Sequence, residues 1–174
     1  MADPPQTLVL RRHRDLEGRR REAWARRGLL CLVGLVPVLA LFNVFGQRPQ
    51  TARASTPAAA LTVYAPTRVR AGLIYAARFR INARQELKDA TLVFDPSWAE
   101  SYTVNGLAPQ PANESSRDGR LAYSFGQLAA GHSILFFLSL QVNPTNVGHR
   151  AQNVDLYDGE TRLASIHRTV TIFP

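Results

Sequence analysis

The sequence predicts an all-β protein, an antiparallel β-sandwich of seven to eight strands that is preceded by one transmembrane helix. Residues 28–47 form one unbroken apolar run. From Leu61 onward, apolar residues alternate with polar ones, which is typical of half-buried strands. Turn residues separate these runs at regular spacing, without helical periodicity between them. The predicted organisation is a basic tail (1–27), the helix (28–47), an extended linker (48–60) and the sandwich (61–174).

The apolar run has the length and composition of a membrane span. Twelve of its twenty residues are Leu, Val or Phe, and no charged residue falls between Arg27 and Arg48. A helix of this length covers about 30 Å, the thickness of a bilayer core. Its apolar side chains favour insertion by about −5 kcal/mol before the polar terms. We expect Pro37 to kink the helix, and the anchor to include Gly28, Leu35, Pro37 and Phe45.

Charge on either side of the run predicts its orientation. The formal net charge is +8, and residues 1–27 carry eight arginines against four acids. Only Arg48 and Arg53 follow closely behind the run. The positive-inside rule therefore predicts a single-pass protein of the cell membrane, with a cytoplasmic N-terminus and an extracytoplasmic C-terminal domain. Such flanks need no nucleic acid as a partner, and the bilayer is the partner that they predict.

Three alternatives to a permanent anchor are a cleaved signal peptide, a twin-arginine signal and a buried helix of a soluble domain. The last is disfavoured because all faces of the run are apolar and no other segment is helical enough to surround it. Ala52-Arg53-Ala54 has the small-x-small form of a cleavage site, which would make the run a signal peptide cleaved near Ala54. Arg26-Arg27 partially matches a twin-arginine signal. The leader of 27 residues and the long apolar run favour the anchor. Cys31 is the chain's one cysteine, so the outer domain is expected to depend on its core for stability.

The strands of the outer domain are read from period-two patterns and turns. Within residues 73–82, the side chains of Tyr75, Ala77, Phe79 and Ile81 share one face, and Arg78, Arg80 and Asn82 share the other. Asp158-Gly159 predicts a hairpin turn between the last strands. The predicted strands are residues 61–64, 73–82, 87–94, 101–104, 121–125, 133–142, 151–157 and 166–173.

Several motifs of the outer domain resemble bacterial cell-surface repeat domains of immunoglobulin type, the CARDB-like group. Such domains have Val-x-Ala-Gly before a Tyr-containing strand, as in residues 69–72 before Tyr75. They also have an Asp before an apolar strand, as at Asp89, and a Gly-x-Leu-x-x-Gly-x-Ser pattern, as in residues 126–133. The resemblance covers one copy, residues 61–174. It implies an immunoglobulin-like sandwich that spaces or binds other molecules at the cell surface, without catalysis.

No pattern in the outer domain indicates a reaction. His132, His149 and His167 lack the spacing of a metal site, although His149 and His167 could be neighbours across strands. Residues 48–174 contain no Cys or Met, which excludes a blue-copper site there. A Gly-x-Ser-x-Gly elbow is also missing from the sequence. We therefore expect a protein that is not an enzyme, with no catalytic residue, metal, cofactor or small-molecule substrate.

A long polar segment, residues 105–119, is predicted to be a loop, either functional or mobile. Aromatic residues precede it, either as an exposed contact or as part of the core. The candidate partner contacts are Trp98, Tyr102, Asn105 and Asn113. The predicted function is a non-catalytic, membrane-anchored accessory protein whose sandwich binds an integral membrane or envelope protein. The alternative is an adhesion module of the cell envelope that binds wall polymer or a soluble ligand.

Overall fold

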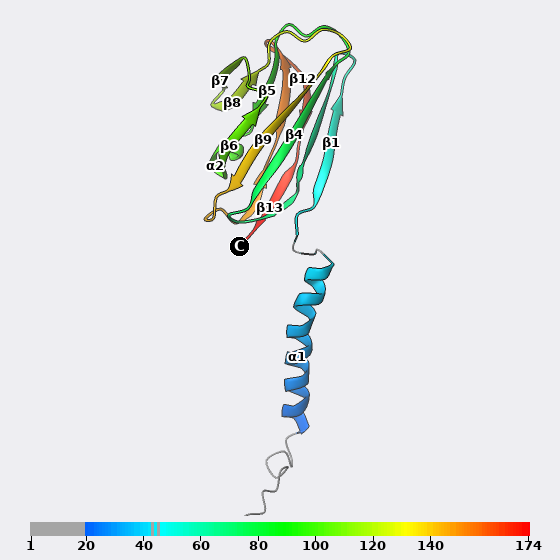
Figure 1. Cartoon of the computed structure of the whole chain (residues 1–174), viewed down its shortest axis with the longest axis vertical. Coiled ribbons are helices and arrows are strands. Elements are labelled where there is room, and N and C mark those ends of the chain that lie inside the picture. The colour runs from blue at the N-terminus through cyan, green and yellow to red at the C-terminus, as the bar shows by residue number, and fades with distance from the viewer. Residues whose placement is uncertain (1–19, 43, 45) are drawn as a thin grey trace, which may run out of the picture. The chain divides into compact units, whose positions relative to one another are not determined.

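The computed structural model describes residues 20–42, 44 and 46–174 of the chain (Figure 1). The chain divides into two compact units, residues 1–45 and 46–174. In the described residues of the first unit, the secondary structure is helix α1, Arg20–Leu41. The second unit contains thirteen strands and the one-turn helix α2, Ser97–Glu100, within the part of the chain that the structure describes.

Helix α1 provides the apolar segment, with different limits from those predicted. Its window Glu22–Leu41 has a mean hydropathy of 1.6 and is long and apolar enough to cross a membrane. The helix begins inside the basic segment because Glu, Ala and Arg are strong helix formers. The predicted limit at residue 47 is wrong. The amide of Val44 donates to the carbonyl of Leu39, five residues back, so the regular α-helical pattern has ended there.

The strands of the second unit form three sheets. The first sheet has the order β1-β2-β4-β9-β6, the second β12-β11-β5-β8-β7 and the third β10-β13-β3. All neighbours are antiparallel except β13 and β3. The strands are β1 Pro49–Ser55, β2 Ala59–Pro66, β3 Arg68–Arg70, β4 Ile74–Ala83, β5 Ala90–Phe94, β6 Tyr102–Ala108, β7 Asn113–Arg117, β8 Arg120–Ser124, β9 Ser133–Val142, β10 Gly148–Ala151, β11 Val154–Asp158, β12 Thr161–Ile166 and β13 Thr169–Phe173.

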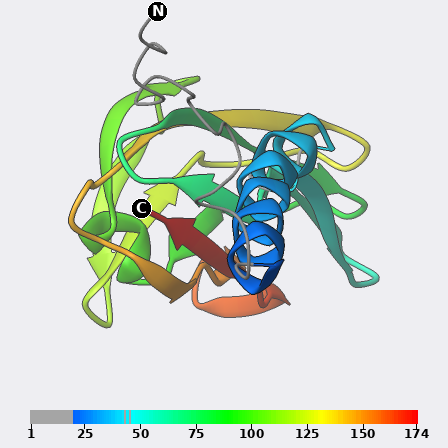
Figure 2. The ribbon, with the colours of Figure 1, turned by 90° about the horizontal axis from the view of Figure 1, so that it is seen from below.

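The predicted fold class is confirmed: the second unit is an antiparallel sandwich of immunoglobulin-like type, and one apolar helix precedes it. The two larger sheets enclose the core. The C-terminal strand β13, drawn in red, lies at the end of the sandwich that faces the viewer in Figure 2. The structure has more strands than the seven or eight predicted, because short polar strands such as β7 and β10 lack the alternating hydrophobic pattern.

The predicted linker, residues 48–60, is wrong, because most of it belongs to the first sheet. Strand β1 pairs with β2 along its whole length, from Pro49 opposite Pro66 to Ser55 opposite Ala60. An edge strand is held by backbone hydrogen bonds to one neighbour, so it needs little hydrophobic pattern of its own. The folded unit therefore begins at Gly46 rather than at Leu61.

The predicted loop at residues 105–119 is also wrong. The first part of this segment belongs to strand β6, which pairs with β9 in the first sheet. A later part forms β7, which pairs with β8 in the second sheet. Asp118 and Gly119 connect β7 to β8 with φ angles of +51° and +73°. Two consecutive residues in this region form the hairpin turn that Asp-Gly favours. A polar sequence conceals these strands because both lie at sheet edges, where their side chains face water.

The predicted hairpin at Asp158-Gly159 is confirmed, since β11 pairs with β12 and Asp158 lies opposite Thr161. Gly159 has a φ of +54°. The Asp158 carboxylate also accepts hydrogen bonds from the amides of Lys88 and Asp89, at 2.7 and 2.9 Å. The hairpin is thereby fixed to the chain that leads into β5. The predicted strand at 166–173 is divided between β12 and β13, which belong to different sheets.

Aromatic side chains fill the centre of the sandwich. The Phe79 ring centroid lies 5.2 Å from that of Phe94, 5.6 Å from that of Trp98 and 5.9 Å from that of Phe136. Tyr123 joins the cluster at 5.6 Å from Phe94. Each large apolar side chain contributes about 1.5 to 3 kcal/mol when it is removed from water. This core stabilises a domain that lacks cysteine and so has no disulfide.

Candidate functional site

The outward face of the first sheet has an unusual composition. In β4 the side chains of Phe79 and Ile81 are buried, while those of Arg78 and Arg80 are exposed, as the alternation predicts. Charged pairs on a sheet surface interact mainly with the residues directly opposite on neighbouring strands. The register of the sheet shows what surrounds Arg78 and Arg80.

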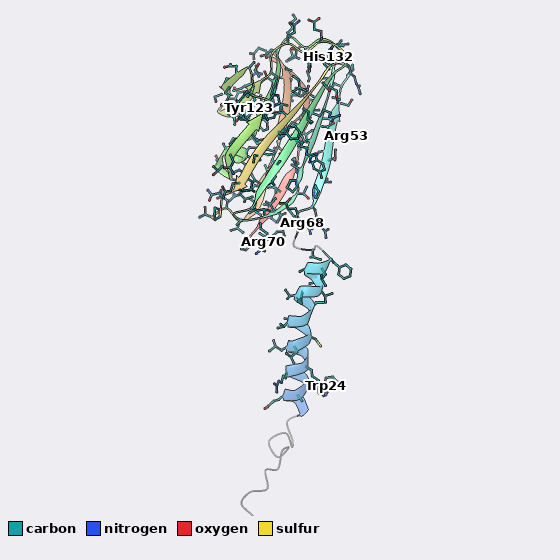
Figure 3. The ribbon with its side chains drawn as sticks, in the orientation of Figure 1. Trp24, Arg53, Arg68, Arg70, Tyr123 and His132 are labelled. Carbon is teal, nitrogen blue, oxygen red and sulfur yellow. The ribbon has the colours of Figure 1, made fainter. Side chains whose placement is uncertain are left out.

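Two rows of outward side chains cross the sheet from β1 to β9. In one row, Arg53 lies opposite Thr62, which lies opposite Arg80, which lies opposite Leu135. Figure 3 shows Arg53 on β1, at the edge of this sheet. In the next row, the order is Thr51, Tyr64, Arg78 and Phe137. We call the larger outward side chains of these rows the arginine face: Arg53, Tyr64, Arg78, Arg80, Leu135 and Phe137.

All members of the arginine face except Phe137 line a depression of about 610 Å³. Four arginines line the depression and none of the lining residues is acidic. The depression is open to solvent and its wall contains both polar and apolar groups. The lining residues are Thr51, Arg53, Ala54, Ser55, Ala60, Leu61, Thr62, Tyr64, Arg78, Arg80, Asn82, Arg84 and Leu135.

The arginines differ in how they are held. The guanidinium carbon of Arg78 lies 5.1 Å from the ring centroid of Tyr64 and 6.0 Å from that of Phe137, within the range of cation–π attraction. The Nη1 group of Arg84 donates to the carbonyl of Thr56 at 2.9 Å. Among the described residues, Arg53 and Arg80 form neither an ion pair nor a side-chain hydrogen bond. Their positive charges are therefore available to a partner.

The apolar members of the face are also accessible. Tyr64 and Phe137 are each 36% exposed and Leu135 is 37% exposed. Interfaces between proteins are enriched in aromatic side chains and arginine at their centres. Nothing in the sequence pattern alone brings Arg53 to this surface, because the register of β1 decides it.

A second depression, of about 420 Å³, lies on the second sheet and is lined by three acidic side chains and one arginine. It includes Asp89, Asn113, Arg117 and Glu160. Arg117 pairs with Glu160, and the Asp89 carboxylate accepts a hydrogen bond from Ser124 at 2.5 Å. Asp89, Arg117 and Glu160 already have partners within the described chain, so this depression offers fewer unpaired charges to a ligand than the arginine face does.

On the same sheet, Asp155 is buried and paired. Its Oδ2 accepts a hydrogen bond from Arg120 Nη1 at 2.8 Å, and its Oδ1 accepts one from Ser165 at 2.5 Å. Burial acts to raise the pKa of this carboxyl. The hydrogen bonds and the positive charge of Arg120 outweigh burial, so the pKa lies below its ordinary value. This pair is part of the fold, and it gives a pH-dependent test of it.

A polar cluster is buried near β10 and β13. The fully buried Gln152 side chain donates from Nε2 to the hydroxyl groups of Tyr75 and Tyr102, at 3.1 and 2.9 Å. Burial raises the pKa of both tyrosines, which stay neutral. Burial lowers the pKa of Arg168, whose Nη2 donates to the carbonyls of residues 65 and 66. These bonds connect the C-terminal part of the chain to β2.

Of the four predicted partner contacts, two are buried in the structure and two are exposed. Trp98 and Tyr102 are only 1% and 4% exposed, so the prediction of a surface contact is wrong for both. Their rings pack in the core because α2 turns Trp98 inward, where its indole N–H donates to the carbonyl of Asn153 at 3.2 Å. Asn105 and Asn113 are exposed, on β6 in the first sheet and on β7 in the second. Neither lines the arginine face.

Of the predicted anchor residues, Gly28, Leu35 and Pro37 lie in α1, and Leu35 is exposed. Phe45 lies outside the described residues. Of the three histidines of the second unit, only His149 lies in a strand. His149 on β10 pairs with Thr171, and His167 follows β12 with its Nε2 3.3 Å from the Ser165 hydroxyl. Within the described residues, no three His, Cys, Asp or Glu side chains gather in a group that could hold a metal ion.

No family model matches the chain, and no curated protein matches it. Solved structures that match include the third cohesin ScaC of Acetivibrio cellulolyticus, determined in complex with the ScaB dockerin. Its identity is 9% and its TM-score 0.39, over 62% of this chain and 94% of that chain. A non-cellulosomal cohesin of Archaeoglobus fulgidus matches with 13% identity and a TM-score of 0.37, over 72% and 92%.

A third match is AvmM, which catalyses macrocyclization in alchivemycin A biosynthesis. Its identity is 7% and its TM-score 0.41, over 74% of this chain and 90% of that chain. Since the TM-scores of all three structures lie below 0.5, these likenesses carry no argument about the activity or the partners of this chain. The resemblance to CARDB-like domains in particular stays a prediction from the sequence motifs.

Proposed function

We propose that this chain is a non-catalytic accessory protein, anchored in the membrane by α1, whose sandwich binds a partner protein through the arginine face. The observation that carries the proposal is the composition of that face. Arg53 and Arg80 have no acidic partner among the described residues, and exposed aromatic and aliphatic side chains lie beside them. A surface with these properties gains free energy when a complementary surface covers it.

Arg53 and Arg80 contribute little to the fold itself. Arg53 and Arg80 lie on either side of Thr62, so their backbones are about 9.6 Å apart at the usual strand spacing. Two positive charges at about 10 Å repel each other by about 0.4 kcal/mol in water. Salt screens this small repulsion, so the fold tolerates both exposed charges and leaves them available for binding.

The anchor and its orientation follow from the sequence at α1. The helix is apolar enough to cross a bilayer, and the arginines before it favour a cytoplasmic N-terminus. The sandwich would then face the extracytoplasmic side, in the manner of the CARDB-like domains that its motifs resemble. Its partner would be an integral membrane protein or another envelope protein that reaches the arginine face.

Copurification tests the proposal. We expect the full-length tagged protein, extracted in mild detergent, to retain one partner in a stoichiometric amount. The charge-reversed variant Arg53→Glu with Arg80→Glu should release that partner. The matched variant Arg70→Glu with Arg150→Glu changes the charge equally on the third sheet, and it should retain the partner. A wild-type protein that carries no partner and stays with the cell wall after detergent extraction would contradict the proposal and support an adhesion module.

Topology is tested separately. A reporter fused after Pro174 should be active only outside the cytoplasm, and the mature chain should still contain residues 20–41. An intracellular reporter would contradict the proposed orientation. A mature N-terminus near Ser55 would contradict the anchor, and it would also remove most of β1 from the first sheet.

A further inference from the structure

The distance between the arginine side chains along β4 indicates the chemistry of the partner that the arginine face would bind. Arg78 and Arg80 lie two positions apart on β4, so their side chains leave the sheet about 6.7 Å apart. Carboxylates two positions apart on an extended polypeptide have the same repeat of about 6.7 Å. An extended acidic segment can therefore place successive carboxylates over successive arginines without a change of register.

Arg78 and Arg80 form a basic stripe along β4, and an apolar stripe lies beside it. On the neighbouring strand β9, Leu135 lies opposite Arg80 and Phe137 lies opposite Arg78. Neighbouring strands are about 4.8 Å apart, so the apolar and basic stripes are contiguous. The far side of the basic stripe is bounded by Tyr64 and, across Thr62, by Arg53. The surface therefore offers charge and apolar contact within the width of a few strands.

We propose that the arginine face binds an extended, acidic segment of a protein that also presents apolar side chains. This inference rests on the proposed function and specifies its partner. Carboxylates two positions apart in the segment pair with Arg78 and Arg80 along β4. Arg53, across Thr62, provides a further positive charge that no described residue neutralises. Apolar side chains of the segment cover Leu135 and Phe137. A polyanionic polymer would neutralise the arginines but leave these two side chains exposed to water, so a polypeptide fits the surface better.

The choice of variants follows from the contacts. Arg78 is stacked on Tyr64 and Phe137, so its removal would disturb the surface itself. Arg53 and Arg80 make no such contact in the described chain, and the variant Arg53→Gln with Arg80→Gln is expected to fold. The matched control is Arg70→Gln with Arg150→Gln, which removes the same charge from exposed positions of β3 and β10.

Fluorescence anisotropy of a labelled peptide measures the interaction directly. The full chain is placed in nanodiscs of a zwitterionic lipid and titrated into a short peptide that contains only Asp, Glu, Leu and Phe. We expect the Arg53→Gln, Arg80→Gln variant to bind the peptide about tenfold more weakly, the sum of two surface ion pairs of about 0.7 kcal/mol each. The control variant should bind the peptide as the wild type does.

A second peptide, with Ser in place of Leu and Phe, separates the apolar contribution. We expect this peptide to bind at least about fivefold more weakly, since two partly exposed apolar side chains lose about 1 kcal/mol of burial. Equal binding of both peptides, or tighter binding of inorganic polyphosphate than of the first peptide, would identify a polyanion site and overturn the inference. An equal loss of binding in the control variant would show attraction by net charge alone, which also overturns it.

The proposed function and this inference fail in different ways. A copurified partner that the charge-reversed variant retains binds through another surface, so it overturns both the role of the arginine face in the proposed function and the inference. Release of the partner together with equal binding of both peptides overturns the inference alone. A full-length protein that binds the first peptide specifically, but copurifies with no partner and stays with the wall, overturns the proposed function. Release of the partner by the arginine variants, together with specific peptide binding, supports both.

Discussion

Replacement of Trp98 by Phe tests the position of this side chain in the core. The indole is 1% exposed, and its ring centroid lies 5.6 and 5.7 Å from those of Phe79 and Phe94. Loss of the hydrogen bond from its N–H to the carbonyl of Asn153 costs about 1 kcal/mol. The smaller ring leaves a void that costs about 1 to 2 kcal/mol more. We expect a total destabilisation of about 2 to 3 kcal/mol.

Urea unfolding of the full-length protein in mild detergent, followed by far-ultraviolet circular dichroism, measures this loss. With an m value of about 1.5 kcal/mol/M, the midpoint should fall by about 1.5 M. The matched control is Trp24→Phe in α1, where the side chain is 70% exposed. It should leave the midpoint of the sandwich unchanged. Circular dichroism is the suitable signal because each variant removes one of the chain's two tryptophans.

The competing interpretation of Trp98 predicts the opposite result. If its ring were an exposed partner contact, Trp98→Phe would weaken partner binding and leave the midpoint within about 0.3 M of the wild type, as for ordinary surface substitutions. That outcome would refute the arrangement of α2 against the core. It would also return Trp98 and Tyr102 to the candidate binding surface.

Three further predictions concern the anchor, a buried ion pair and a turn. Leu35→Arg places a charge near the middle of α1 at about 3 kcal/mol of insertion free energy, so carbonate extraction should release more of the protein; full retention would contradict a membrane span. Asp155→Asn should destabilise the fold at pH 7, and this difference should shrink as the pH falls below about 4, because the lowered pKa gives stability that is present above the unfolded-state pKa and lost on protonation. A pH-independent difference in urea midpoints would contradict the pairing with Arg120. Gly72→Ala should cost about 1 kcal/mol, because the φ of Gly72 is +76°; an unchanged thermal midpoint would contradict that conformation.

The strands with a buried face are those that the sequence predicts best. Strands β4 and β9 alternate buried and exposed side chains over ten residues each, and the faces predicted for β4 agree with the structure. The prediction fails at β1 and β7, whose side chains are mostly exposed. Such edge strands are held by backbone hydrogen bonds, which leave no hydrophobic period in the sequence.

In the candidate site, too, residues on a strand with a hydrophobic period could be predicted, and residues on an edge strand could not. Arg78 and Arg80 could be assigned to an exposed face from their alternation with Phe79 and Ile81. Arg53 could not, because it was placed in a linker, and only its pairing with Thr62 brings it beside the others. Trp98 was uncertain from the sequence because a short helix before a strand can turn an aromatic ring either inward or outward. The packing around Phe79 and Phe94 resolves this.

The sequence by itself indicated the class of the protein: an apolar helix long enough for a membrane, followed by short strands whose period of two and regular spacing are typical of a sandwich. Both signals are local, because the length of an apolar run and the alternation of a strand are properties of neighbouring residues. Only the tertiary structure decided which arginines share a surface and which aromatic side chains are buried. Those relations depend on strand register, which joins residues that are far apart along the chain.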